Sequence, residues 1–227
     1  MSTNQLLKQL WFEKREFITS EELIEYSKAL YFSYSNNMIK YLISRGYLLK
    51  IFRNIFYVKS RNEFQFNKIK YSPLELVSKG LKLKRVHNWY FGLYTALTLN
   101  GITNNHDQEF YIINDKIVNH KPIKIEHYPL NFLILKSRLL NFGIIKNKIQ
   151  YSDLEKTILD FIYLWKINKK TDTKIIQNIT EFIRDISKDK IIKYSNYYPE
   201  SNRKILEKLI KLLDLMKNRE LSYKKNL

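Results

Sequence analysis

The chain has 227 residues, of which 44% are hydrophobic, and it carries a formal net charge of +18. This length and apolar content suffice for one large or two small domains and exclude global disorder. The absence of cysteine excludes disulfides, thiolate zinc sites, iron–sulfur clusters and a cysteine nucleophile. The N-terminus lacks the apolar core of a signal peptide and no run of about 18 apolar residues occurs, so we expect a cytoplasmic protein with no membrane partner.

Three short helices are predicted near the N-terminus. Apolar residues recur at helical spacing over residues 4–14. An apolar residue, a hydroxyl and two acids at 18–22 are typical of the start of a second helix. A polar break at 33–37 precedes a third helix that ends at Gly46, where glycine suits a left-handed cap.

A β-hairpin follows these helices. Residues 47–52 and 55–58 are rich in aromatic and β-branched residues and flank the dipeptide Arg53-Asn54. Asparagine tolerates a positive φ, so this dipeptide suits a two-residue turn. Three helices followed by a basic hairpin predict a winged helix-turn-helix domain over residues 1–62.

Positive charge is concentrated at this hairpin and just after it. Residues 1–44 contain equal numbers of basic and acidic side chains, whereas in residues 45–70 only Glu63 opposes seven cations. These cations are Arg45, Lys50, Arg53, Lys59, Arg61, Lys68 and Lys70. A local block of this kind indicates a surface that neutralises backbone phosphates.

The predicted interface with double-stranded DNA places the helix over 35–45 in the major groove and the hairpin on the adjacent backbone. Polar side chains at the N-terminus of a helix in the groove reach base edges, and asparagine can bond adenine at two atoms. The candidate contacts are Ser35, Asn36, Asn37, Lys40, Tyr41, Arg45, Lys50, Arg53 and Asn54. The alternative is that the polar residues only cap a helix and that the hairpin is a solvated edge.

After a polar linker at 61–71, a second domain is expected over residues 71–227. Apolar spacing predicts helices at 73–81, 88–99, 153–165, 174–187 and 201–217, and strand-like runs occur at 110–113, 123–127, 132–135 and 149–151. The predicted fold is therefore α+β: the winged helix-turn-helix is followed by a mixed α/β domain with a small sheet and C-terminal helices.

Few residues suggest chemistry. His87, His106, His120 and His127 have no metal-ligand spacing and are interpreted as solvated or structural. The sequence Asp172-Thr173-Lys174 has the Asp-x-Lys form of metal-dependent nucleases, but it lies in a polar connector. The aromatic run 89–91 and Tyr94 are expected in a core, although aromatics at a surface can stack on bases. We expect no catalytic activity, metal or cofactor.

Three stretches of the chain resemble the AbiEi antitoxin family. The first is the winged helix-turn-helix itself, with LISRGYL at 42–48 and FRNIFY at 52–57, where Asn54 replaces the turn glycine usual in the family. The second is WYFGLYTAL at 89–97, and the third is YSDLEKTILD at 151–160. The likeness covers about residues 15–166, and the region after 170 gives no firm match.

The resemblance implies a transcriptional repressor and antitoxin of a phage-defence toxin–antitoxin system. The N-terminal domain would bind repeats in its own promoter as a monomer or dimer, and the second would counter a nucleotidyltransferase toxin without forming a stable complex. The family-like residues of the second domain are Tyr90, Gly92, Thr95, Glu155, Lys156, Thr157 and Asp160. We interpret them as scaffold. A metal-dependent nuclease and a basic RNA-binding or interaction module remain alternatives.

Overall fold

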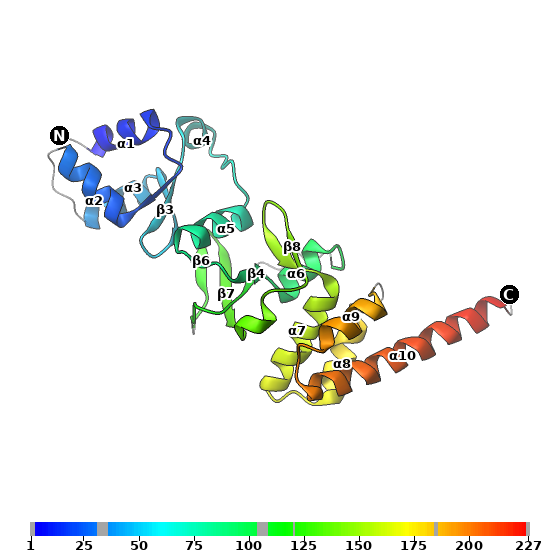
Figure 1. Cartoon of the computed structure of the whole chain (residues 1–227). Helices are drawn as coiled ribbons and strands as arrows, with labels where there is room; N and C mark the ends of the chain where they lie inside the picture. Colours follow the sequence, from blue (N-terminus) through cyan, green and yellow to red (C-terminus); the bar gives the residue numbers. More distant parts are fainter. Residues whose placement is uncertain (1–2, 31–35, 104–108, 120, 184–185, 226–227) are drawn as a thin grey trace. The chain divides into compact units, whose positions relative to one another are not determined.

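The structure is a computed structural model of the chain (Figure 1). It describes residues 3–30, 36–103, 109–119, 121–183 and 186–225, without the side chains of residues 3, 36 and 216–225. The chain divides into a first unit, formed by residues 1–87 and 124–129, and a second unit, formed by residues 88–123 and 130–227. Helices and a sheet occur in each unit, so the predicted α+β class is confirmed. Among the described helices, none has the length and apolarity required to span a bilayer.

The first unit begins with three helices, as predicted. Its first elements are α1 (Thr3–Phe12), β1 (Phe17–Thr19), α2 (Ser20–Ala29), α3 (Asn36–Ser44), β2 (Leu48–Phe52) and β3 (Ile55–Val58). Thr19 caps α2, because its hydroxyl accepts the Glu22 amide N–H while the Glu22 carboxylate accepts the Thr19 amide N–H. The short strand β1 was not predicted: the residues interpreted as a helix start also pair with β3.

Strands β2 and β3 form the predicted hairpin, and β1 joins it to give a sheet in the order β1-β3-β2. Asn54 in the turn has a φ of 63°, the left-handed conformation that asparagine tolerates. One face of this sheet packs on the three helices. The core there consists of Leu6, Leu7, Leu10, Ile18, Leu23, Met38, Ile39, Leu42, Leu48, Phe56 and Val58.

Residues 61–71, interpreted as a linker, contain the helix α4 (Arg61–Phe66). Ser60 and Glu63 form its capping box, and the Phe64 ring stacks on Tyr47 with centroids 4.4 Å apart. Helix α5 (Pro73–Leu83), expected at the start of the second domain, instead groups with the first unit and contacts β2 and β3. Pro73 follows the capping Ser72, as the sequence indicates.

A six-stranded sheet has the order β6-β7-β5-β4-β9-β8. Its strands are β4 (Trp89–Phe91), β5 (Phe110–Asn114), β6 (Ile123–Ile125), β7 (Tyr128–Ile134), β8 (Ile144–Lys146) and β9 (Gln150–Ser152). Strand β4 runs antiparallel to β5 and parallel to β9, and β5 runs parallel to β7. Four strands match predicted runs, whereas β4 and β8 were not expected.

The helix predicted over residues 88–99 is wrong in its first part. Trp89–Phe91 is a fully buried strand, and only Leu93–Leu99 is helical (α6). Three consecutive aromatics suit a strand that is covered on both faces. A run of three residues is shorter than one helical turn, so the spacing of its apolar side chains cannot distinguish a helix from a strand.

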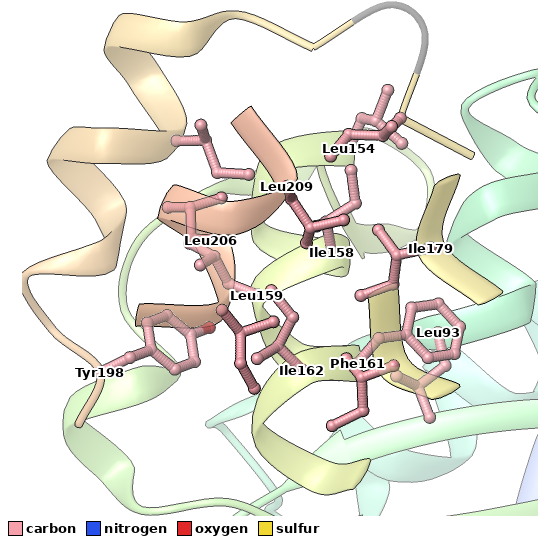
Figure 2. Packing of buried hydrophobic residues seen from close by; sticks show 14 of the residues in the cluster. Leu93, Leu154, Ile158, Leu159, Phe161, Ile162, Ile179, Tyr198, Leu206 and Leu209 are labelled. Atoms are coloured by element: carbon pink, nitrogen blue, oxygen red, sulfur yellow. The ribbon is translucent and has the colours of Figure 1, made fainter. Parts of the chain in front are cut away.

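Helix α7 (Leu154–Ile167) is central to the core of the second unit (Figure 2). Around it lie α6, α8 (Asp172–Thr180), α9 (Lys188–Ser195) and α10 (Glu200–Lys225). Ile158 and Leu159 of α7 lie beside Leu206 and Leu209 of α10 in this cluster. The helix predicted at 174–187 ends earlier, and a separate helix, α9, begins after Ser187.

Candidate nucleic-acid interface

Helix α3 presents one apolar and one polar face. Met38, Ile39 and Leu42 are buried against the core of the first unit. The opposite face is exposed at i, i+3, i+4 and i+7 spacing: Asn37, Lys40, Tyr41 and Ser44, with Arg45 directly after the helix. We call these five residues the α3 stripe. Because no part of the described first unit buries this stripe, its side chains are available to a ligand.

Of the remaining predicted contacts on this helix, Ser35 lies outside the described residues, and only the backbone of Asn36 is described. Tyr41 is 42% exposed, and the Arg45 guanidinium lies 5.6 Å from its ring centroid. This cation–π contact orders the two large side chains at the end of the stripe without neutralising the charge.

The hairpin exposes its turn and one cation of its edge strand. Lys50 points outward from β2, and Arg53 and Asn54 are exposed in the turn. The Asn54 carbonyl accepts the Ser20 amide N–H at 3.1 Å, which ties the turn to the first residue of α2. The turn is therefore held in place by the helix that precedes α3.

Four of the predicted cations, on the α3 stripe and the hairpin, form no ion pair with any residue that the structure describes. The ion pairs found within the described part of the first unit join Arg15 to Glu22 and Lys70 to Glu16. Neither involves Lys40, Arg45, Lys50 or Arg53. The seven cations of residues 45–70 therefore do not form one uniform surface. Lys70 is paired with Glu16, and the Arg61 guanidinium lies 5.1 Å from the Trp11 ring centroid.

Glu63, the only acid of that block, is used internally. Its carboxylate accepts hydrogen bonds from the Tyr57 hydroxyl at 2.6 Å and from the Ser60 and Lys70 amides. Burial tends to raise the pKa of Glu63, but these donors outweigh it and hold the pKa below its ordinary value. Glu63 therefore stabilises the base of the hairpin and does not screen the turn.

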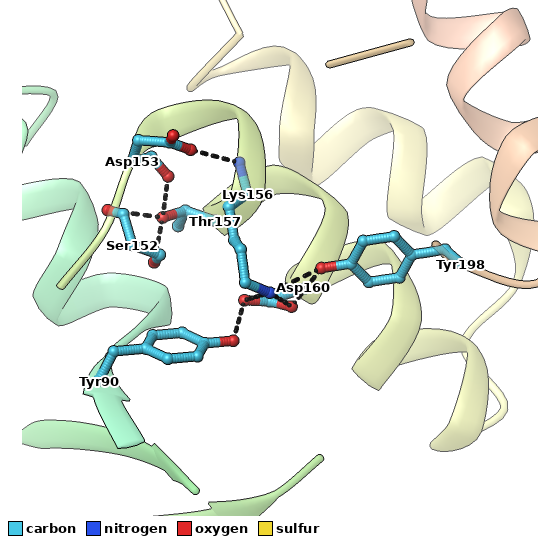
Figure 3. A network of polar contacts seen from close by, with 7 residues as sticks. All are labelled: Tyr90, Ser152, Asp153, Lys156, Thr157, Asp160 and Tyr198. Atoms are coloured by element: carbon cyan, nitrogen blue, oxygen red, sulfur yellow. Dashed lines mark hydrogen bonds and ion pairs between the residues drawn. The ribbon is translucent and has the colours of Figure 1, made fainter. Parts of the chain in front are cut away.

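Three of the family-like residues of the second unit, Tyr90, Lys156 and Asp160, meet in a buried polar network (Figure 3). The Lys156 side chain is fully buried, with Nζ 2.9 Å from Asp160 Oδ1 and 2.9 Å from the Tyr198 hydroxyl. Asp160 also accepts the hydroxyls of Tyr90 at 2.7 Å and Tyr198 at 2.6 Å. Lysine, carboxylate and two phenols thus satisfy one another inside the core.

The electrostatics of the network follow from burial. Burial lowers the pKa of Lys156, and Asp160 opposes this by favouring the charged ammonium. Burial and the Asp160 charge raise the pKa of both Tyr90 and Tyr198 well above the ordinary phenol value. The Lys156 ammonium also lies 4.7 Å from the Phe142 ring centroid. Lys156 and Asp160 are thus paired with each other and with phenols of the core, which fits the interpretation as scaffold.

Gly143 makes room for this lysine. Its φ is +63°, and a Cβ there would stand 2.8 Å from Lys156 Cβ. Tyr198, Phe142 and Gly143 belong to the network but were not expected from the sequence. Tyr198 is 42 positions from Lys156, and no local pattern links them.

The start of α7 holds two further family-like residues, Glu155 and Thr157. Asp153 caps the helix through the Lys156 amide, and Thr157 donates to the Asp153 carbonyl at 2.7 Å. Glu155 accepts the Ser187 amide N–H at 2.8 Å and pairs with Lys190 at 2.9 Å. Burial alone would raise the pKa of Glu155, but these partners lower it. Glu155 therefore joins the N-termini of α7 and α9.

Gly92 and Thr95 have packing roles. A Cβ on Gly92 would lie 2.4 Å from Ile113 Cδ1, so a larger residue at this point would require the buried Ile113 side chain to move. The Thr95 hydroxyl accepts the Tyr111 amide N–H at 2.9 Å and thereby joins α6 to β5. Trp89, Tyr90 and Phe91 are buried, so the interpretation of this run as core is confirmed.

The residues weighed for metal chemistry do not gather. His87 and His127 are exposed, and His106 and His120 lie outside the described residues. Asp172 binds Lys166 at 2.9 Å and Lys208 at 3.2 Å, so lysines occupy the carboxylate of the Asp-x-Lys sequence. Within the described ranges, no group of three His, Asp or Glu side chains is placed to hold a metal ion.

Comparisons with known proteins give a likeness of fold. No protein-family model and no curated protein matches this sequence. The crystal structure of the RV2827C protein from Mycobacterium tuberculosis is similar, with a TM-score of 0.59 and 10% sequence identity. The alignment covers 93% of this chain and 76% of that one. At this identity the similarity concerns the fold alone.

Proposed function

We propose that this chain binds double-stranded DNA through α3 and the β2–β3 hairpin and represses transcription of its own operon. Its first unit has the element order of a winged helix-turn-helix, three helices with β1 joined to the hairpin. In this proposal α3 enters the major groove and the hairpin contacts the backbone.

The observation that carries the proposal is the exposed α3 stripe next to a hairpin with unpaired cations. In this proposal the phosphates are neutralised by Lys40, Arg45, Lys50 and Arg53, and the exposed Asn37 near the N-terminus of α3 would bond a base edge. An exposed cation without a protein partner contributes little to folding, whereas each phosphate that it neutralises contributes to binding through counterion release.

The finer part of the proposal concerns the second unit, which we infer to act as an antitoxin toward a nucleotidyltransferase. This rests on the resemblance of residues 89–97 and 151–160 to the AbiEi family. The support from the geometry is that these two stretches meet in one network, through Tyr90, Lys156 and Asp160. They would maintain the domain's shape and would not act on the toxin chemically.

The test is retention of labelled duplex from upstream of the gene by the full chain in rising salt, with a scrambled duplex and an RNA duplex as competitors. Selective retention of the upstream duplex is the expected result. Equal competition by RNA would favour a basic RNA-binding module, and cleavage that requires Mg²⁺ would favour a nuclease. Either outcome would overturn the proposal.

A second experiment separates the two proposed activities. The chain is co-expressed with the product of the neighbouring gene, which the proposal expects to be a nucleotidyltransferase toxin, and growth and promoter activity are measured together. The Arg53→Glu variant should no longer repress the promoter, because the change lies in the first unit. It should still protect growth from the toxin, which the proposal assigns to the second unit. If a normally folded Arg53→Glu variant loses both repression and growth protection, the antitoxin activity does not belong to the second unit alone.

A further inference from the structure

Helix α5 lies directly against the hairpin within the first unit (Figure 1). The closest approach is at Gly80, where a Cβ would stand 2.7 Å from the Phe52 ring and 2.8 Å from Ile51 Cγ2. A larger residue at this position would require the Phe52 ring, the Ile51 side chain or the helix to shift. The C-terminal end of α5 is thereby fixed beside Phe52, the residue that precedes Arg53 in the hairpin turn.

Three cations stand at this end of α5, and we call them the α5 cluster: Lys82, Lys84 and Arg85. All three are exposed, and none belongs to an ion pair in the described part of the first unit. Lys84 Nζ lies 5.7 Å from the Phe52 ring centroid. This contact directs one cation of the cluster toward the turn that carries Arg53.

The backbone at Arg85 has a conformation that favours glycine. The Arg85 amide bonds to the Lys82 carbonyl and the Val86 amide to the Leu81 carbonyl, which is a Schellman ending of the helix. Arg85 occupies the left-handed position of this motif with a φ of 56°. An arginine there is strained relative to glycine. Cations near a helix C-terminus also interact favourably with its dipole, which is the purely structural explanation for the cluster.

We propose that the α5 cluster is a second contact to DNA backbone phosphates, continuous with Arg53 of the hairpin. The inference rests on the proposed DNA binding and extends its footprint from the hairpin to α5. The cluster would add phosphate contacts without reading bases, so its removal should weaken binding to all duplexes alike and reduce the salt dependence.

The decisive variant is Arg85→Gly, because the two explanations predict different results. Glycine relieves the strained backbone, which raises the unfolding midpoint in denaturant, whereas loss of the charge beside the helix dipole lowers it. The midpoint therefore shows only that the variant is folded, and a phosphate contact predicts that duplex binding weakens in that folded variant. The magnitude of the slope of log K for duplex binding against log salt concentration should then decrease by about 0.9. A dipole role alone predicts no change in that slope.

Lys14→Gly is the matched control. Lys14 ends α1 in the same motif, with a φ of 53°, and its amide and that of Arg15 bond back to Trp11 and Leu10. It is exposed and precedes the end of β1 that pairs with Tyr57, away from the hairpin turn. This variant loses one charge and gains the same backbone relief, but the salt slope should not change.

The triple variant Lys82→Gln, Lys84→Gln and Arg85→Gln tests the whole cluster, with a slope reduction of up to about 2.7 expected. One outcome is that the unaltered chain binds duplex and that the single and triple variants keep its salt slope. The proposed phosphate contact of the α5 cluster is then wrong, and the proposed function stands. The proposed contact is also wrong if Lys14→Gly reduces the salt slope as much as Arg85→Gly does. If the unaltered chain retains no duplex at low salt, the proposed function itself is wrong and the cluster with it.

Discussion

Lys50 in the first unit and Lys156 in the second lie in opposite environments. Lys50 is exposed on the edge strand β2 and has no carboxylate partner among the side chains that the structure describes. Lys156 is fully buried, and Asp160 and Tyr198 bond its ammonium. A buried charge persists only when such partners replace the lost water, so Lys156 serves the fold, while Lys50 is free for an anionic partner.

The comparison shows that total charge is a poor guide in a chain with 40 basic residues. The informative quantity is the number of cations that the fold leaves exposed and unpaired at one place. On the α3 stripe and the hairpin these are Lys40, Arg45, Lys50 and Arg53. The following predictions test the contrast between these cations and Lys156.

The largest effect is expected from Asp160→Ala. This change leaves the Lys156 ammonium buried without its carboxylate, which should cost about 3–5 kcal/mol of the free energy of unfolding. Chemical denaturation of the full chain measures it. The double variant Lys156→Met, Asp160→Leu should recover much of the loss, because it removes both charges together. An unchanged stability of Asp160→Ala would show that Lys156 is hydrated and that the contrast is wrong.

Alkaline pH should weaken the network next. Tyr90 and Tyr198 remain neutral in the folded state at a pH where an unfolded phenol, with its pKa of 10.0, has ionised. Their contribution is therefore complete below pH 10 and is lost as the pH rises further, at about 1.4 kcal/mol per pH unit for each tyrosine.

The measurement is made above pH 10.5, the ordinary lysine pKa. Because the pKa of Lys156 is lowered in the folded state, this lysine makes the free energy of unfolding rise with pH up to about pH 10.5. Above pH 10.5 the lysine is neutral in both states, so its contribution no longer changes with pH. The double variant Tyr90→Phe, Tyr198→Phe should lose stability less steeply with pH than the unaltered chain. Equal slopes would mean that these phenols ionise as readily in the fold as in the unfolded chain.

In the first unit, Arg53→Glu should weaken duplex binding by about one order of magnitude or more at low salt and reduce the salt slope by at least about one. The loss should be similar for upstream and scrambled duplexes, because a phosphate contact reads no bases. The unfolding midpoint should hardly change, since Arg53 is exposed and forms no ion pair with the residues that the structure describes. Unchanged binding would count against the hairpin as a DNA contact.

The smallest overall change in affinity is expected from Asn37→Ala. If Asn37 bonds a base edge at two atoms, its loss should reduce discrimination at one base pair by about 1–3 kcal/mol and leave the salt slope unchanged. Binding to a set of duplexes with single substitutions measures this. A uniform loss across the set would show that Asn37 does not read sequence.

The sequence alone determined the elements whose signals are local. The capping at Thr19 and the Arg53-Asn54 turn each lie within a few residues of chain, and each is present in the structure. Apolar spacing also predicted helix α7, but not its surroundings, because residues 154–162 are buried on every side, polar residues included. The two faces of α3 were also predictable, because helical spacing separates Met38, Ile39 and Leu42 from the exposed stripe. The assignment of this region to DNA binding remains a prediction.

Only the tertiary structure decided which charges are free and which are used. Lys70 and Lys50 look alike in sequence, but Glu16 reaches Lys70 from a distant part of the chain. The same holds for Tyr198 beside Lys156, and for Gly80, whose missing side chain sets α5 against the hairpin. These contacts join residues far apart in the sequence, and desolvation and ion pairing depend on distance in space, so no local pattern encodes them.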